Sequence, residues 1–163
     1  MNGGHKELLS KREYKRLSRL SDSQVVEELL DYGFGYHNIS EATKVSVPTL
    51  KRQAHQTTEH DVKFSPTCRN RLLEFIAFAS HIQGRYGVED VASWFESKID
   101  PSVALTPLNF YSKSAEGLLL CILRKEISIE DAFLLFDVNW KAKYTSIYEV
   151  FTSQDGQLSI REK

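Results

Sequence analysis

Apolar side chains that recur every three or four residues are the feature that most constrains the fold of this chain. In residues 21–32 and 66–82 the apolar positions follow the spacing of one helix face. Serine or threonine precedes most of the segments with this helical spacing, as is typical of helix N-termini. In three places a proline follows that residue within two positions, which is also typical of a helix start. Alternation of period two is not sustained anywhere, although residues 134–138 and 148–151 are candidates for short strands. The pattern predicts an all-α fold.

The helix boundaries follow from the same signals. Ser21, Ser46 and Ser128 are expected N-caps, and Gly33 and Gly87 are expected to close the helices that precede them. The polar residues 152–163 are expected to fray. The expected helices cover residues 6–20, 21–32, 39–44, 48–55, 66–84, 88–99, 118–123 and 129–136, with two more that start at residues 107 and 139.

Length and composition narrow the class of protein. The 163 residues suffice for one domain or two small ones, and 41% apolar with 26% charged residues excludes a disordered or rod-like chain. The longest apolar run, residues 118–123, is too short to span a membrane. No secretory signal is expected at the start of the sequence. Two distant cysteines, Cys68 and Cys121, argue against a disulfide framework or a zinc site and suggest a cytoplasmic setting.

Charge is distributed unevenly along the chain. Residues 1–20 carry a net charge of +4, residues 21–43 carry −5, residues 44–85 carry +4 and residues 86–163 carry −4. Two basic segments before an acidic C-terminal half suggest one end that faces a polyanion and another that faces protein. Chance scatter of charge is the alternative.

Residues 39–55 have the spacing of a helix-turn-helix. Ile39 and Ala42 would pack beneath the second helix, while Val47 and Leu50 anchor that helix to the core. The turn has Lys44 near the place where such turns usually carry glycine. The hydroxyl, guanidinium and amide groups expected to face outward suit phosphates, guanine and adenine. The expected DNA-facing residues of this segment are Ser46, Pro48, Thr49, Lys51, Arg52 and Gln53, with Arg52 reading guanine and Gln53 adenine.

A basic helix upstream could add contacts to the phosphate backbone. Its expected phosphate-binding residues are Lys11, Arg12, Lys15 and Arg16, with Arg19 nearby. The alternative is a helix face that only aids solubility, and for residues 39–55 the alternative is an ordinary helical hairpin with a solvated polar face.

Enzymatic chemistry has no recognisable signature here. The five histidines are scattered, and neither a zinc motif, a paired-carboxylate arrangement nor a phosphate loop is present. We therefore expect no catalytic site, no metal and no cofactor.

The second half carries a family resemblance. Residues 87–95 read Gly-Val-Glu-Asp-Val-Ala-Ser-Trp-Phe, residues 105–108 read Leu-Thr-Pro-Leu, and residues 115–124 read Ala-Glu-Gly-Leu-Leu-Leu-Cys-Ile-Leu-Arg. With the preceding helix-turn-helix pattern, this order resembles the Xre/MbcA/ParS family of type II antitoxins over most of residues 20–128. The chain departs from the family in having Ala104-Leu105 where glycines usually precede Thr-Pro, and about 30 residues continue past the usual end.

The resemblance implies an all-helical antitoxin that dimerises, binds its own promoter and blocks an NAD-consuming toxin of the RES type. It implies a toxin-facing surface with Trp94, Thr106, Pro107, Leu108 and the C-terminal segment. Core packing is the alternative for Trp94. Trp140, Tyr144 and Tyr148 are expected to form an exposed aromatic patch, unless their helix docks back onto the core.

A second resemblance covers residues 24–99, which look like the C subunit of the flagellar master regulator and related activators of conjugative elements. That family continues into a four-cysteine zinc site, which this sequence lacks. The resemblance implies a DNA-binding activator that needs a partner subunit.

Together these observations predict a cytoplasmic, sequence-specific DNA-binding regulator. Residues 1–58 would form the helix-turn-helix module, and residues 59–163 a helical module for dimerisation or partner binding. A homodimer is expected because one recognition helix reads only a few base pairs. The competing hypothesis is a protein-interaction module that does not bind DNA.

Overall fold

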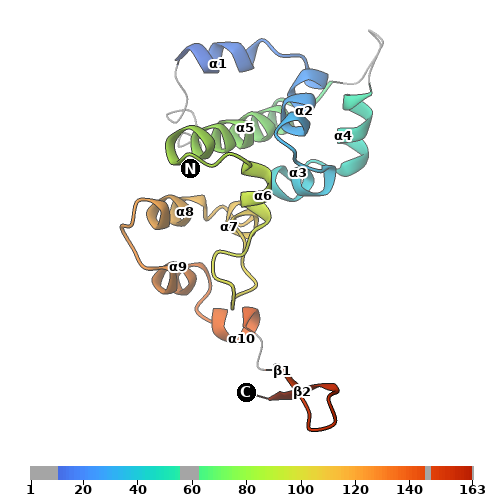
Figure 1. Ribbon diagram of the computed structural model, residues 1–163. Helices are drawn as coiled ribbons and strands as arrows, with labels where there is room; N and C mark the ends of the chain where they lie inside the picture. The colour runs from blue at the N-terminus through green and yellow to red at the C-terminus, as the bar shows by residue number, and fades with distance from the viewer. Residues whose placement is uncertain (1–10, 56–62, 146–147, 163) are drawn as a thin grey trace. The chain divides into compact units, whose positions relative to one another are not determined.

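The computed structural model describes residues 11–55, 63–145 and 148–162, and within them the chain is mostly helical (Figure 1). The all-α expectation is therefore confirmed. The fold separates into two compact units, Met1–Glu96 and Ser97–Lys163, named here the N-terminal and C-terminal units. The N-terminal unit contains α1 (Lys11–Ser18), α2 (Asp22–Asp31), α3 (Tyr36–Thr43), α4 (Val47–Ala54), α5 (Pro66–Tyr86) and α6 (Val91–Glu96).

Side-chain caps explain where most helices begin. Ser21 accepts a hydrogen bond from the backbone N–H of Gln24, and the Gln24 side chain accepts one from the N–H of Ser21, which completes a capping box at α2. Three other starts have the hydroxyl half of this arrangement alone: a serine side chain accepts from the backbone N–H three residues later. The serines are Ser46 at α4, Ser65 at α5 and Ser128 at α9 (Ile129–Phe136). The expected N-caps at residues 21, 46 and 128 are confirmed.

Four phenylalanine rings form the core of the N-terminal unit. The centroid of Phe95 lies 5.5 Å from Phe34, 5.3 Å from Phe75 and 5.9 Å from Phe78. Phe75, Phe78 and Phe95 are fully buried, and Phe34 nearly so. These rings come from α5, α6 and the loop after α2, so one cluster joins three parts of the unit.

Gly33 allows the loop after α2 to pass close to α6. Its φ of +98° lies in the left-handed region, which side chains with a Cβ rarely adopt. A Cβ added there would also lie only 3.4 Å from the Cβ of Ala92. This approach places Phe34 in the aromatic cluster.

The compact units divide after Glu96 rather than near residue 58. The physical reason is that α5 packs against both α2 and α3, and α6 packs against α5. Residues 63–96 therefore share the core of the first helices.

The C-terminal unit contains α7 (Pro107–Ser112), α8 (Glu116–Leu123), α9, α10 (Trp140–Tyr144), β1 (Tyr148–Thr152) and β2 (Leu158–Glu162). Successive helices pack on one another from α7 to α10. Phe110 stacks on Phe136 with 4.3 Å between ring centroids, and Phe133 lies 5.1 Å from Trp140. These aromatic contacts form a second, separate core.

The described end of the chain is a β-hairpin. β1 and β2 pair antiparallel, with Val150 opposite Ile160 and Thr152 opposite Leu158. The short strand expected at residues 148–151 is confirmed, whereas the expected fraying of residues 152–162 is wrong. Gly156, with φ +83°, provides the turn that reverses the chain.

Within the described ranges, no helix is both long and apolar enough to cross a membrane.

Candidate nucleic-acid interface

The turn between α3 and α4 is short and fixed by its own hydrogen bonds. Lys44 ends α3 in the left-handed conformation, with φ +63°, which is the conformation that glycine usually provides in such turns. The Thr43 hydroxyl donates to the carbonyl of Ile39 at 2.6 Å and accepts from the N–H of Val45 at 3.4 Å. Ser46 then begins α4, because its hydroxyl accepts from the N–H of Thr49 at 3.3 Å. The two helices are thus held in one arrangement.

One face of α4 is buried and the other is exposed. The helix packs against α2 and α3, and Leu50 is fully buried. Gln53 lies one helical turn after Leu50 and is only 1% exposed. The expectation that Gln53 faces outward to read adenine is therefore wrong, because it shares the face of Leu50. Thr49 is half-buried, and the exposed residues of this segment are Ser46, Pro48, Lys51, Arg52 and His55.

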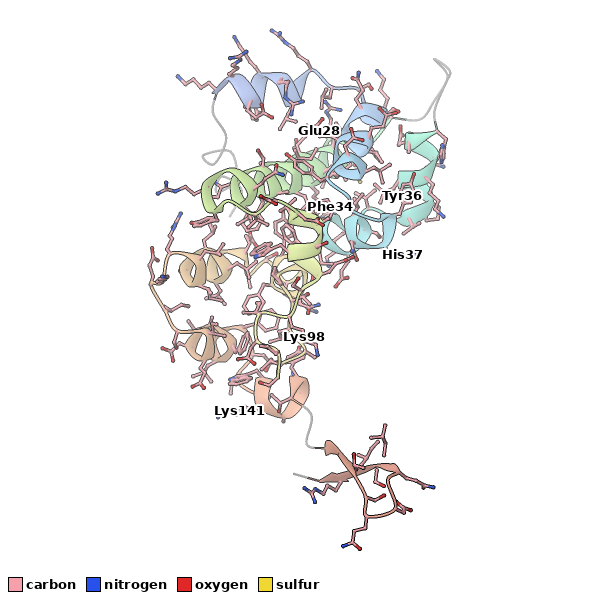
Figure 2. The ribbon with its side chains drawn as sticks, in the orientation of Figure 1. Glu28, Phe34, Tyr36, His37, Lys98 and Lys141 are labelled. Atoms are coloured by element: carbon pink, nitrogen blue, oxygen red, sulfur yellow. The ribbon has the colours of Figure 1, made fainter. Side chains whose placement is uncertain are left out.

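The exposed face of α4 is basic. Lys51 and Arg52 lie in its last turn, and the Lys51 ammonium lies 5.7 Å from the ring centroid of Tyr36 on α3. Figure 2 shows Tyr36 where α3 approaches α4. Arg52 has no ion-pair partner among the residues that the structure describes. Arg52 is itself exposed.

The basic face of α1 is only partly available. The Arg16 guanidinium bridges Glu13 and Glu28, with N–O distances of 2.6 Å to each. Its hydrogen bonds hold the pKa of Glu13 below the usual range, and the two carboxylates raise the pKa of Arg16. Figure 2 shows Glu28 on α2, on the side toward α1. Arg16 thus fastens α1 to α2, so it is poorly placed for the phosphate contact expected of it, while Lys11, Arg12 and Lys15 are exposed.

A half-buried ion pair that the sequence pattern does not predict fixes the start of α2. Arg69 on α5 donates to the Asp22 carboxylate at 2.8 Å and to the carbonyl of Leu20. Asp22 also accepts from the N–H of Phe64 at 2.7 Å. Nothing local in the sequence indicates these pairs, because the partners are more than 40 residues apart. The contacts hold α1, α2 and α5 together at one point.

α4 and α1 form two separate basic surfaces of the same unit. In Figure 1, α2 lies between them. The structure therefore does not merge the two predicted sets of DNA-facing residues into one continuous patch.

The predicted partner-binding residues are mostly structural. Thr106 caps α7 in a capping box with Asn109, and Pro107 and Leu108 are buried behind it. Trp94, in the N-terminal unit, is half-buried with its ring 5.0 Å from Phe95, so part of it contributes to core packing.

Trp140, the first residue of the expected exposed aromatic patch, is buried. Trp140 is only 8% exposed and packs on Phe133, and Tyr144 is half-buried with its ring 6.3 Å from Phe136. For Trp140, docking back onto the core is the correct interpretation. The side chain of Tyr148 lies outside the described part of the structure.

No group of three or more His, Cys, Asp or Glu side chains in the described residues is arranged to hold a metal ion. No family model matches the chain, and comparisons with curated proteins and with solved structures found no match.

Proposed function

We propose that the N-terminal unit binds double-stranded DNA and that the chain is a sequence-specific transcriptional regulator. The observation that carries the proposal is the two-sided character of α4. Leu50 and Gln53 seat the helix on α2 and α3, while Lys51 and Arg52 remain exposed on its other side. A short helix anchored on one side and basic on the other suits insertion into the major groove.

Each exposed group of α4 has a chemical role in this proposal. Arg52 pairs with a guanine edge, since its planar guanidinium can donate two hydrogen bonds to O6 and N7. Lys51 contacts a phosphate, and its position over the Tyr36 ring orders the long side chain. The start of α4, marked by exposed Ser46, faces a second phosphate.

The basic helix α1 supplies phosphate contacts in the same proposal. Lys11, Arg12 and Lys15 are exposed and could neutralise backbone charge without reading sequence. Arg16 has a different role, because its ion pairs with Glu13 and Glu28 hold α1 in place.

The finer part of the proposal is an antitoxin-like autorepressor that acts as a dimer and also binds a protein partner. Two copies reading two half-sites would give the specificity that one short helix lacks. The resemblance to the Xre/MbcA/ParS family supports a toxin as the partner. Because Pro107 and Leu108 are buried, they would shape such a surface from beneath rather than touch the toxin.

The test uses duplex DNA from upstream of the chain's own gene. Arg52→Ala is expected to weaken binding by about 1–3 kcal/mol and to reduce the preference over a scrambled duplex, because a bidentate base contact is lost. Arg85→Ala is the matched control: Arg85 is also exposed but lies in the last turn of α5, at the end away from α4 (Figure 1).

The comparison of the two variants decides whether α4 reads DNA. Loss of affinity in Arg52→Ala with unchanged binding in Arg85→Ala supports the proposal. Equal affinities for both variants would show that α4 is not the recognition helix.

A further inference from the structure

The exposed side of α4 is one stripe of residues, and one member of the stripe is apolar. The exposed positions have the spacing of neighbours on one side of a helix, and they are Pro48, Lys51, Arg52 and His55. Leu50 lies on the opposite, buried side. The Pro48 side chain can neither donate nor accept a hydrogen bond. The phosphate and guanine contacts proposed for Lys51 and Arg52 therefore leave Pro48 without a role.

The first turn of α4 holds Pro48 in a fixed position. The hydroxyl oxygens of Ser46 and Thr49, on either side of it in sequence, lie 2.7 Å apart. Ser46 also accepts a hydrogen bond from the backbone N–H of Thr49 at 3.3 Å. The proline ring restricts its own φ as well. Because the backbone and the ring have little freedom left to lose, a contact made by Pro48 costs little conformational entropy.

The chemistry of the major groove selects one base for such a group. The base edges there present hydrogen-bond donors and acceptors, and thymine in addition presents its 5-methyl group. A proline ring laid over a donor or an acceptor would remove water from it without replacing the hydrogen bond. Against the thymine methyl group the same ring buries apolar surface on both sides.

The position of Pro48 relative to Arg52 sets where this thymine lies. Pro48 precedes Arg52 by four residues, which is about one helical turn. Side chains three or four residues apart on a helix in the major groove contact successive bases, as in zinc fingers. The thymine and the guanine are therefore expected in neighbouring base pairs.

We propose that Pro48 contacts the 5-methyl group of a thymine in the base pair next to the guanine that Arg52 reads. The assignment rests on the proposed function, and it names two adjacent bases of the site that α4 binds. Thymine recognition through Pro48 adds specificity that Arg52 and the phosphate contacts do not supply.

The experiment removes single methyl groups from the DNA. Duplexes that the full chain binds tightly are first selected from a random-sequence pool, and each thymine of the bound site is then replaced in turn by deoxyuracil. At one thymine the wild-type chain is expected to lose about threefold to fourfold in affinity, which is the contribution of one buried methyl group. Pro48→Ser removes the ring but keeps a residue that helix starts accept, so this variant is expected to bind the thymine and deoxyuracil duplexes equally.

The matched control makes the same substitution at another exposed proline. Pro66 lies in the first turn of α5, and Pro66→Ser is expected to keep the wild-type preference for thymine. Circular dichroism checks that both variants retain the helical content of the wild type.

A second replacement in the same duplexes tests the neighbouring position. Each guanine is exchanged for 7-deazaguanine, which lacks the N7 acceptor that arginine uses. One exchange is expected to weaken binding of the wild type but not of Arg52→Ala, and that guanine is expected beside the thymine sensed by Pro48.

The outcomes separate this inference from the proposed function. Selection of no duplex would refute the proposed function and this inference with it. Tight binding that is indifferent to every thymine methyl group would overturn the inference alone. Three further results would do the same: a thymine preference retained in Pro48→Ser, its loss in Pro66→Ser, or a sensed thymine that does not adjoin the guanine read by Arg52.

Discussion

The buried ring of Phe95 gives the most quantitative prediction for the fold. Phe95 is fully buried, and its ring lies within 6 Å, centroid to centroid, of Phe34, Phe75 and Phe78. Phe95→Ala removes the ring from the centre of this cluster and leaves a cavity. Deleting a buried phenylalanine ring costs about 3–5 kcal/mol of unfolding free energy. Each aromatic pair lost adds to this cost beyond the buried area alone.

The assay is urea unfolding followed by tryptophan fluorescence. The chain has two tryptophans, and Trp94 lies beside Phe95 while Trp140 lies in the other unit. A Trp140→Phe background therefore lets Trp94 report the N-terminal unit alone. With a slope of about 1.5 kcal/mol/M, the expected loss lowers the urea midpoint by about 2–3 M.

Phe95→Leu keeps the measurement possible if Phe95→Ala does not fold. Leucine retains most of the apolar volume, so the expected loss is only about 1–1.5 kcal/mol. A shift below about 0.5 M for Phe95→Ala would refute the conclusion that these rings form the core of the N-terminal unit.

Two smaller predictions follow from caps and ion pairs. Ser46→Ala should destabilise the N-terminal unit by about 1 kcal/mol through loss of the α4 cap, measured by the same Trp94 transition; an unchanged midpoint would contradict that role. The pKa of Glu13 is lowered by its hydrogen bond from Arg16, so this pair stabilises the fold above about pH 4.5 and the contribution is lost as the pH falls through the folded pKa. Glu13→Gln should therefore flatten the acid limb of the stability curve, and an acid limb identical to wild type would count against the pair.

Helix starts were predictable because capping is local chemistry. Ser21 and Ser128 are exposed and lie outside the core. Each fixes a helix start because its hydroxyl accepts a hydrogen bond from the backbone N–H three residues later. The pattern predicts that α3 starts at residue 39, whereas the helix starts three residues earlier, at Tyr36. Its N-cap is Gly35, which has no side chain to signal a cap.

Burial of particular side chains could not be predicted in the same way. The helix-turn-helix pattern predicts that Gln53 faces outward. Its spacing of three residues from the buried Leu50 instead places both on one face of α4. Trp140 docks onto Phe133, a tertiary contact without a local signal. The β2 strand did have a signal, since Asp155-Gly156 is a common turn pair and stands between the strand expected at residues 148–151 and apolar Leu158.

The division between the units depends on contacts that no composition shift reveals. α5 returns to α2 through Arg69 and Asp22, 47 residues apart in sequence. A boundary near residue 58 would cut through this contact. The base-reading role of Arg52 and the phosphate-binding role of Lys51 remain predictions, supported by the exposure of both side chains.

The most direct test of the central claim is binding of the wild-type chain to duplex DNA over a salt series. The duplexes are the region upstream of its own gene and a scrambled sequence of the same composition, each labelled for fluorescence anisotropy. We predict binding to the upstream duplex at least about a thousandfold tighter, with a logarithmic salt slope of several units. Two results would contradict the claim: equally weak binding to both duplexes, or the absence of any salt-dependent binding. Either would show that α4 is a structural helix of a protein-interaction module.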